Sequence, residues 1–72
     1  MKSETVKNAI AANLAALQET LAVSMSRAAE AHEAMKAGEQ NQAIGTVIGL
    51  DTELENALAL YRAAIALHQG GR

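Results

Sequence analysis

The side chains in this sequence that could do chemistry are few and widely spaced. Two histidines, His32 and His68, are candidate metal ligands. Neither has a carboxylate or another histidine three or four residues away, the spacing that places two ligands on one face of a helix. The pair His32-Glu33 also does not extend into the His-Glu-x-x-His motif of zinc enzymes. The sequence therefore predicts no metal site and no cofactor within one chain, and a metal site shared by two copies stays an open alternative.

Nucleophilic catalysis finds no support in the sequence either. The chain has no cysteine, and Ser3, Ser24 and Ser26 have no arrangement of histidine and acid that would activate them. The single aromatic residue, Tyr61, recurs with apolar neighbours at helical spacing, so we interpret it as a core or interface residue with its hydroxyl at the rim. No catalytic residue is predicted, and the protein is not expected to be an enzyme.

One charged residue interrupts the apolar pattern of the C-terminal half. Asp51 lies between Leu50 and Leu54, and a carboxylate in an apolar seam needs a partner because an unpaired buried charge is costly. If two antiparallel helices pair so that residue numbers sum to about 78, Arg27 falls opposite Asp51. We therefore predict a structural ion pair between Arg27 and Asp51 that sets the helix register. The alternative is that Asp51 caps a break in its helix.

The elements that position these side chains are predicted to be helices. Alanine, the best helix former, occurs 17 times in 72 residues, and proline is absent. A chain of this length forms one domain, 1–72, whose core contributes only about 3–5 kcal/mol without a disulfide, a metal or a partner. Its net charge is −2, and it has no apolar run of the ~20 residues that a membrane span needs. We expect an all-α, soluble, cytoplasmic protein with no membrane partner.

A heptad pattern predicts the first helix over about residues 4–37. Its apolar and small residues recur at alternating spacings of four and three, which defines a seam for a neighbouring helix. The seam comprises Ile10, Leu14, Leu17, Leu21, Ser24, Ala28, Ala31 and Met35. Gly38 follows the seam at a position typical of a helix C-terminus. A turn at about residues 38–41 follows, with Asn41 or a neighbour capping the next helix.

The second helix is predicted over about residues 42–69. Gly45 and Gly49 each weaken a helix by about 1 kcal/mol relative to alanine. Thr52 with Glu55 has the form of a capping box, which would start a new helix there. One continuous helix is preferred because the apolar residues on either side of the suspected break keep one register. The alternative is a short helix that ends near Gly49, followed by a longer one.

A short turn forces the two helices antiparallel, which predicts a helical hairpin. The apolar side chains of the second helix cover an arc wider than one neighbouring helix can bury. The predicted dimer or partner interface is formed by Ile48, Leu50, Leu54, Leu58, Leu60, Tyr61, Ile65 and Leu67. Within this set Leu50, Leu60 and Leu67, with Ile48 on the opposite flank, are the excess that a partner would bury. The bulky residues between Leu54 and Leu67 are also expected to form the core with the first helix.

This layout resembles the Rop-type hairpin dimers in the number and length of its helices and in their seam. The resemblance implies a homodimer in which two hairpins form a four-helix bundle. Rop-type hairpins bind RNA along their helix faces, which requires a basic face. In this chain the basic residues of the first helix are spread around it and interleaved with glutamates, so nucleic acid is not an expected partner.

Three classes of function follow, in decreasing order of support. The first is a non-catalytic interaction or regulatory module that acts as a homodimeric helical bundle. The second is a small chaperone or adaptor that offers its apolar arc to a helix of another protein. The third is Rop-like nucleic-acid binding. All three are binding functions, and none of them needs a cofactor.

Overall fold

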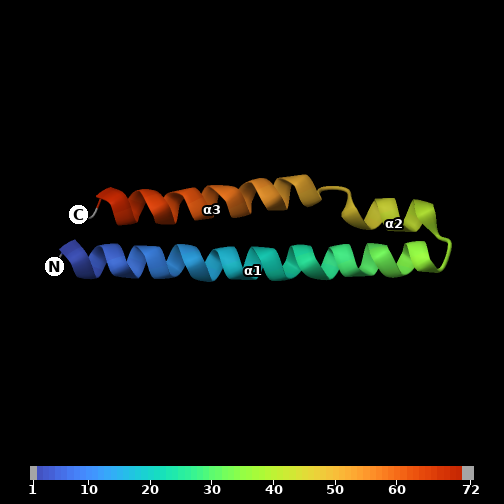
Figure 1. The fold of residues 1–72 in the computed structure, drawn as a ribbon, viewed down its shortest axis with the longest axis horizontal. Coiled ribbons are helices and arrows are strands. Elements are labelled where there is room, and N and C mark those ends of the chain that lie inside the picture. Colours follow the sequence, from blue (N-terminus) through green and yellow to red (C-terminus); the bar gives the residue numbers. More distant parts are fainter. Residues whose placement is uncertain (1, 71–72) are drawn as a thin grey trace.

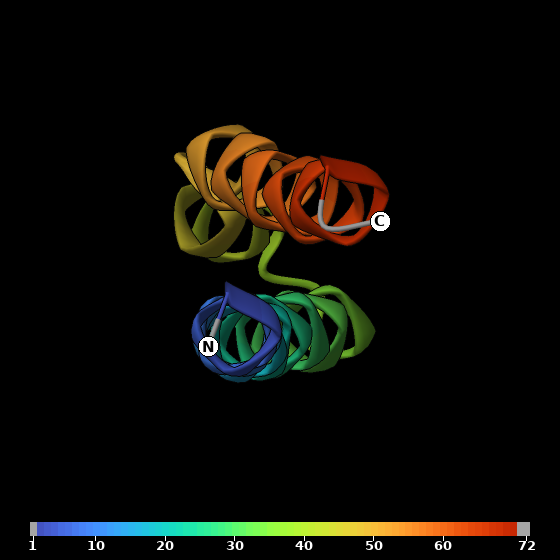
Figure 2. The same cartoon turned by 90° about the vertical axis from the view of Figure 1, so that its left-hand side faces the viewer.

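The computed structural model describes residues 2–70 as an antiparallel pair of helical arms (Figure 1). The first arm is α1, Lys2–Lys36, and the second arm consists of α2, Gln40–Val47, and α3, Leu50–Gly70. No strand occurs among the described residues. The pair measures 55 × 14 × 12 Å, and along the arms α1 forms one layer and α2 with α3 the other (Figure 2). The predicted all-α helical hairpin is confirmed.

Gly38 ends the first arm and lets the chain reverse. Its φ of 81° lies in the left-handed region, which glycine adopts without strain. The Gly38 amide donates to the Met35 carbonyl and the Glu39 amide donates to the Ala34 carbonyl, both at 2.9 Å, which is a Schellman motif. The first helix therefore ends within a residue of its predicted end. Glu39, rather than Asn41, is the N-cap of α2, and its side chain makes no capping hydrogen bond.

The second arm is interrupted between α2 and α3, so the prediction of one continuous helix over 42–69 is wrong (Figure 1). Ile48 is extended, with φ −61° and ψ 130°, and Gly49 has a φ of 92°. A residue in the left-handed region cannot continue a right-handed helix, and glycine occupies that region at the least cost. α3 then begins at Leu50, ahead of the capping box at Thr52 that the sequence suggested.

Small side chains fill the contact between the two arms. The buried residues are Ser24, Ala31, Ala34, Ala43, Ala57 and Ala64. No large side chain among the described residues is fully buried. Because the side chains at a contact set the distance between helix axes, alanine and serine let the two arms approach closely. The core of the hairpin therefore consists mainly of methyl groups, and the large apolar side chains lie beside it or outside it.

The stripe of α3 that faces α1 is not the predicted one. Three leucines that were expected to await a partner are half-buried at heptad positions that face α1: Leu50, Leu60 and Leu67. Four side chains that were expected to form the core with α1 are instead between 40% and 51% exposed: Leu54, Leu58, Tyr61 and Ile65. The buried Ala57 shares its heptad position with Leu50. Small side chains let the two helices approach closely, so the stripe of α3 that contains Ala57 faces α1.

The close contact between the arms can be tested by enlarging one alanine. Ala57 is 5% exposed, so Ala57→Leu should destabilise the protein by about 1–3 kcal/mol because leucine forces the arms apart. Urea unfolding followed by circular dichroism, at one protein concentration, measures this change. Ala59→Leu is the matched control, since Ala59 is exposed on the same helix, and it should alter stability by less than about 0.5 kcal/mol. Equal effects of the two substitutions would contradict the close packing.

The interruption can be tested with two glycines of the second arm. An L-residue at the φ of 92° of Gly49 is strained, so Gly49→Ala should destabilise by about 1–2 kcal/mol. A Cβ on Gly49 would come no closer than 3.8 Å to Arg27 Nη2, so the loss reflects backbone strain and not a clash. Gly45→Ala places its Cβ in open space within α2 and should stabilise by about 0.5–1 kcal/mol. Stabilisation by both substitutions, measured by thermal unfolding, would indicate a continuous helix.

Candidate interaction surface

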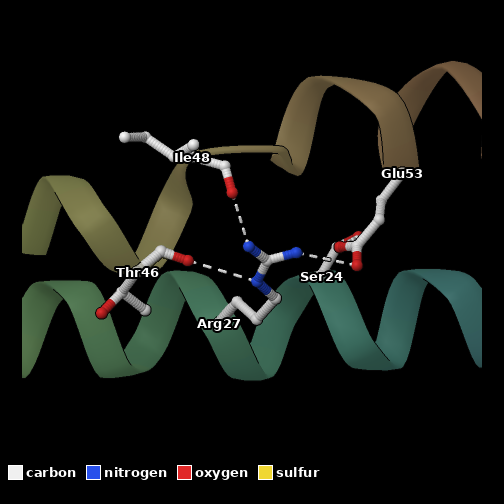
Figure 3. A network of polar contacts seen from close by, with 5 residues as sticks. All are labelled: Ser24, Arg27, Thr46, Ile48 and Glu53. Carbon is white, nitrogen blue, oxygen red and sulfur yellow. Dashed lines mark hydrogen bonds and ion pairs between the residues drawn. The ribbon is translucent and has the colours of Figure 1, made fainter.

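Arg27 of α1 binds the interruption of the second arm (Figure 3). Its guanidinium donates to two backbone carbonyls there, from Nε to Thr46 at 3.2 Å and from Nη2 to Ile48 at 2.7 Å. Its Nη1 donates to Oε2 of Glu53, in the first turn of α3, at 2.8 Å. The Ser24 hydroxyl donates to Oε1 of the same carboxylate at 3.4 Å. These five residues are called the Arg27 cluster below.

The Arg27 cluster satisfies groups that the interruption leaves without partners. A helix leaves its last four carbonyls unpaired and carries partial negative charge at that end. Arg27 supplies both donors and positive charge at the end of α2, while Glu53 places negative charge at the N-terminal end of α3, where it is favourable. The planar guanidinium can serve three acceptors at once because its donors point in fixed, divergent directions.

Glu53 takes the place that the sequence analysis predicted for Asp51. The salt bridge of Arg27 is with Glu53, and Asp51 is exposed in the first turn of α3. The predicted partner, Asp51, lies at the correct height along the hairpin but on a side of α3 that does not face Arg27. Two residues are separated by about 200° around a helix, so only one of these two carboxylates can face α1.

Large apolar side chains lie exposed along one side of both arms. They are Leu14, Leu21 and Met35 in α1 and Leu54, Leu58, Tyr61 and Ile65 in α3, and together they are called the apolar face. Single exposed leucines are ordinary on protein surfaces, whereas large contiguous apolar patches mark sites of interaction. Ile48, which the sequence analysis also placed in the interface, is 68% exposed at the interruption and is not part of this face.

The two stripes of the apolar face lie on the same side of the hairpin. In α1, Leu21 lies four residues after the half-buried Leu17, and in α3, Tyr61 lies four residues after the buried Ala57. An antiparallel helix pair has an approximate two-fold axis normal to its plane, and rotation about that axis exchanges the helices but not the two sides. Residues that follow a contact residue by four positions therefore lie on the same side of the pair in both helices.

The opposite side of the hairpin is hollowed, and carboxylates line two of its hollows. One hollow, at the middle of the molecule, is lined by Glu19, Thr20, Val23, Glu53 and Asn56. Another, near the turn, includes Glu30, Glu33 and Glu39 in its lining. Carboxylates along this side repel phosphate groups, which nucleic-acid binding would have to attract. A further hollow on this side, far from the turn, is apolar and is lined by Val6, Ala63, Ala66, Leu67 and Gly70. The side opposite the apolar face is therefore acidic near the turn and in the middle, and apolar at the far end.

The other side chains singled out in the sequence stand apart from one another. His32 on α1 and His68 on α3 are exposed. Within residues 2–70, no three His, Asp or Glu side chains lie close enough to hold a metal ion. Ser24 is 6% exposed and belongs to the Arg27 cluster, and Tyr61 belongs to the apolar face. None of the helices in the described part of the chain is both long enough and apolar enough to cross a bilayer.

Sequence reasoning missed the contribution of α1 to the apolar face. It assigned Leu14, Leu21 and Met35 to the seam between the two helices, but they are between 46% and 48% exposed. The sequence did contain a signal for the correct stripe. The residues directly before these three are small or polar, recur at the same heptad spacing and can pack closely against the other arm. The chain matches no protein-family model, no curated protein and no solved structure.

The Arg27 cluster predicts a measurable coupling between two residues. Arg27→Ala should lower stability by about 1–2 kcal/mol because two carbonyls and a carboxylate lose their donor. The side chains of Arg27 and Glu53 are 29% and 28% exposed, so solvent screens their ion pair in part. A double-mutant cycle between Arg27→Ala and Glu53→Ala should give a coupling of about 0.5–1.5 kcal/mol in urea unfolding.

The matched control is the same cycle with Asp51→Ala in place of Glu53→Ala. Asp51 makes no ion pair among the described residues, so this second cycle should show a coupling below about 0.3 kcal/mol. Both cycles have to be measured at one protein concentration, because self-association would otherwise change the apparent stability. A larger coupling to Asp51 than to Glu53 would reverse the assignment of the ion pair.

Proposed function

We propose that this protein is a non-catalytic interaction module that acts as a homodimer, with two hairpins joined through their apolar faces in a four-helix bundle. The observation that carries the proposal is the division between small side chains buried inside the hairpin and large apolar ones exposed outside it, most of them on one side. A lone hairpin buries alanine and serine and leaves its largest apolar side chains half in water, which forgoes most of their hydrophobic stabilisation. A second hairpin supplies the other half of that core.

The outline of the whole hairpin is large enough for an interface between two copies. The hairpin measures 55 by 14 Å in the plane of its arms, close to the roughly 800 Å² per partner that a stable interface buries. If each copy buries about 400 Å² of apolar surface, the two together contribute about 20 kcal/mol. Association costs about 4–15 kcal/mol, so the balance favours the dimer.

Both arms contribute equivalent stripes to the apolar face, and this favours a second hairpin over other occupants. A single helix from another protein, as an adaptor would bind, fills one groove between the arms. A second hairpin lays two helices against the two arms and covers both stripes at once. The carboxylates that line two hollows of the opposite side give no support to a role in nucleic-acid binding.

A charge on the apolar face should separate the two copies. Leu58 is 44% exposed, so Leu58→Glu adds little strain to a lone hairpin but buries a carboxylate twice in the dimer. We expect its dimer dissociation constant to rise more than about 100-fold. Sedimentation equilibrium gives the constant directly, since the chain has a mass of 7.5 kDa.

Ala59→Glu is the control for this substitution. It introduces the same charge at the neighbouring exposed residue, which is outside the apolar face, and should leave the dissociation constant within about threefold. A wild-type chain that is a stable, helical monomer at micromolar concentration would refute the homodimer. A chain that is poorly folded alone and becomes helical only with another protein would point instead to the adaptor role.

A further inference from the structure

The apolar surface of the hairpin continues to the end that carries the turn. Ile44 of α2 directly follows the buried Ala43, just as Leu58 of α3 directly follows the buried Ala57. Because the heptad phase is kept across the interruption, Ile44 lies on the same side of the hairpin as Leu58. Ile44 is 53% exposed, and Met35 of α1, at a similar height, is 48% exposed. Large apolar side chains from both arms are therefore exposed beside the turn.

The other end of the same side is charged. Lys7 lies seven residues before Leu14 and continues its stripe, and Glu4 lies one helical turn before Lys7. On α3, His68 lies seven residues after Tyr61 and continues that stripe. The side chains of Glu4, Lys7 and His68 are all exposed. This side of the hairpin is therefore apolar beside the turn and polar at the far end.

A second copy can set its apolar face against this one about either of two axes parallel to the face. An axis across the arms places the two turns at opposite ends, and the copies can slide along each other. An axis along the arms keeps both turns at one end and leaves the height of every residue unchanged. The register of the dimer is then that of the hairpin, in which Ser24 contacts Glu53 and Ala34 lies in one cluster with Ala43.

We propose that two hairpins pair about an axis along their arms, with both turns at the same end, so that α1 of each copy packs antiparallel against the second arm of the other. The inference rests on the homodimer proposed above and specifies its arrangement. Residues that share a height in the hairpin then face each other across the dimer, and large apolar side chains meet from the middle to the turn. The facing pairs are Leu14 with the partner's Ile65, Leu21 with the partner's Leu58, and Met35 with the partner's Ile44.

The arrangement with the turns at opposite ends matches the two ends of the face poorly. If the bulky residues of the two copies overlap, Met35 lies near the partner's Glu4, and Ile44 lies beyond the end of the partner's α3. Sliding the copies until both turn ends are covered places Asp51 between the partner's Leu54 and Leu58 of the same chain. That register buries a carboxylate without a counter-charge.

The charged side chains are compatible with turns at the same end. The three glutamates of the hollow near the turn lie on the opposite side of the hairpin, away from the contact. Asp51 directly follows Leu50, which places it at the outer rim of the contact, opposite the partner's Ala28. The small side chain of alanine leaves the carboxylate open to water. Glu4 and Lys7 also stay hydrated, because α3 ends near their height.

The distance between the two turns tests the arrangement directly. The chain has no cysteine, so Asn41→Cys, at an exposed residue of α2, accepts one spin label per chain. Double electron–electron resonance on the labelled dimer should give a distance of about 20–30 Å, the width of a four-helix bundle with its labels. With turns at opposite ends, hairpins 55 Å long would hold the labels about 50 Å apart. A dimer with only the longer distance would overturn the proposal.

A charge beside the turn tests the same contact by affinity. Met35→Lys places an ammonium group against the partner's Ile44 and should raise the dimer dissociation constant more than about tenfold. With turns at opposite ends the new charge would lie near the partner's Glu4, and the constant would stay unchanged or fall. Ala22→Lys is the control, since Ala22 is exposed on the side of α1 away from α3, and it should change the constant less than about threefold.

The outcomes separate this inference from the proposed function. A dimer that Leu58→Glu dissociates, but that shows the longer label distance and tolerates Met35→Lys, keeps the homodimer and refutes the arrangement. A chain that is monomeric at micromolar concentration refutes both. The shorter distance together with weakening by Met35→Lys supports turns at the same end. Sedimentation equilibrium of the labelled chain and circular dichroism of each variant verify that dimer and helices are retained where the measurement requires them.

Discussion

Close packing of small side chains between the two arms is the constraint on which the rest of this structure depends. Alanine and serine occupy the most buried positions of the contact, and the leucines that face the other arm are only half-buried beside them. The large apolar side chains are therefore displaced to the edges of the contact and onto one side of the hairpin. A fold of this kind gains close packing but little buried apolar area per residue, and a small domain has few other sources of stability. The exposed side chains then form the surface that a partner can stabilise.

The interruption of the second arm depends on a single side chain of the first. A break exposes the carbonyls at the end of α2, and Arg27 binds two of them while pairing with Glu53 at the start of α3. The residues that face α1 keep their heptad phase across the break, from Ala43 through Leu50 to Ala57. The interruption therefore bends the chain without rotating the arm, and the apolar face stays on one side of the molecule.

The two sides of the hairpin are suited to different contacts. Carboxylates line two hollows on one side and disfavour anionic partners there. The other side carries the large, half-exposed side chains of the apolar face. In the homodimer proposed above, a two-fold axis parallel to this face would place it against the same face of a second copy.

Much of the architecture follows from the sequence alone. High alanine content, the lack of proline and the position of Gly38 determine two helical arms and the turn between them, because these effects are local to the backbone. The heptad spacing likewise determines that the apolar arc of the second arm is wider than one helix can cover. Which stripe of that arc faces the other arm was decided only by tertiary structure. Neighbouring stripes have the same periodicity, and the choice depends on side chains of both helices packing together.

The break at Gly49 and the partner of Arg27 were also decided by tertiary structure. Apolar spacing cannot reveal an interruption that keeps its heptad phase, and the sequence offered two carboxylates near the same height, Asp51 and Glu53. The carbonyls that accept hydrogen bonds from Arg27 exist as free acceptors only once the helix is broken. The sequence thus determined the elements and the excess of apolar surface. The tertiary structure decided how they face each other, because close packing and hydrogen bonding depend on groups that are distant along the chain.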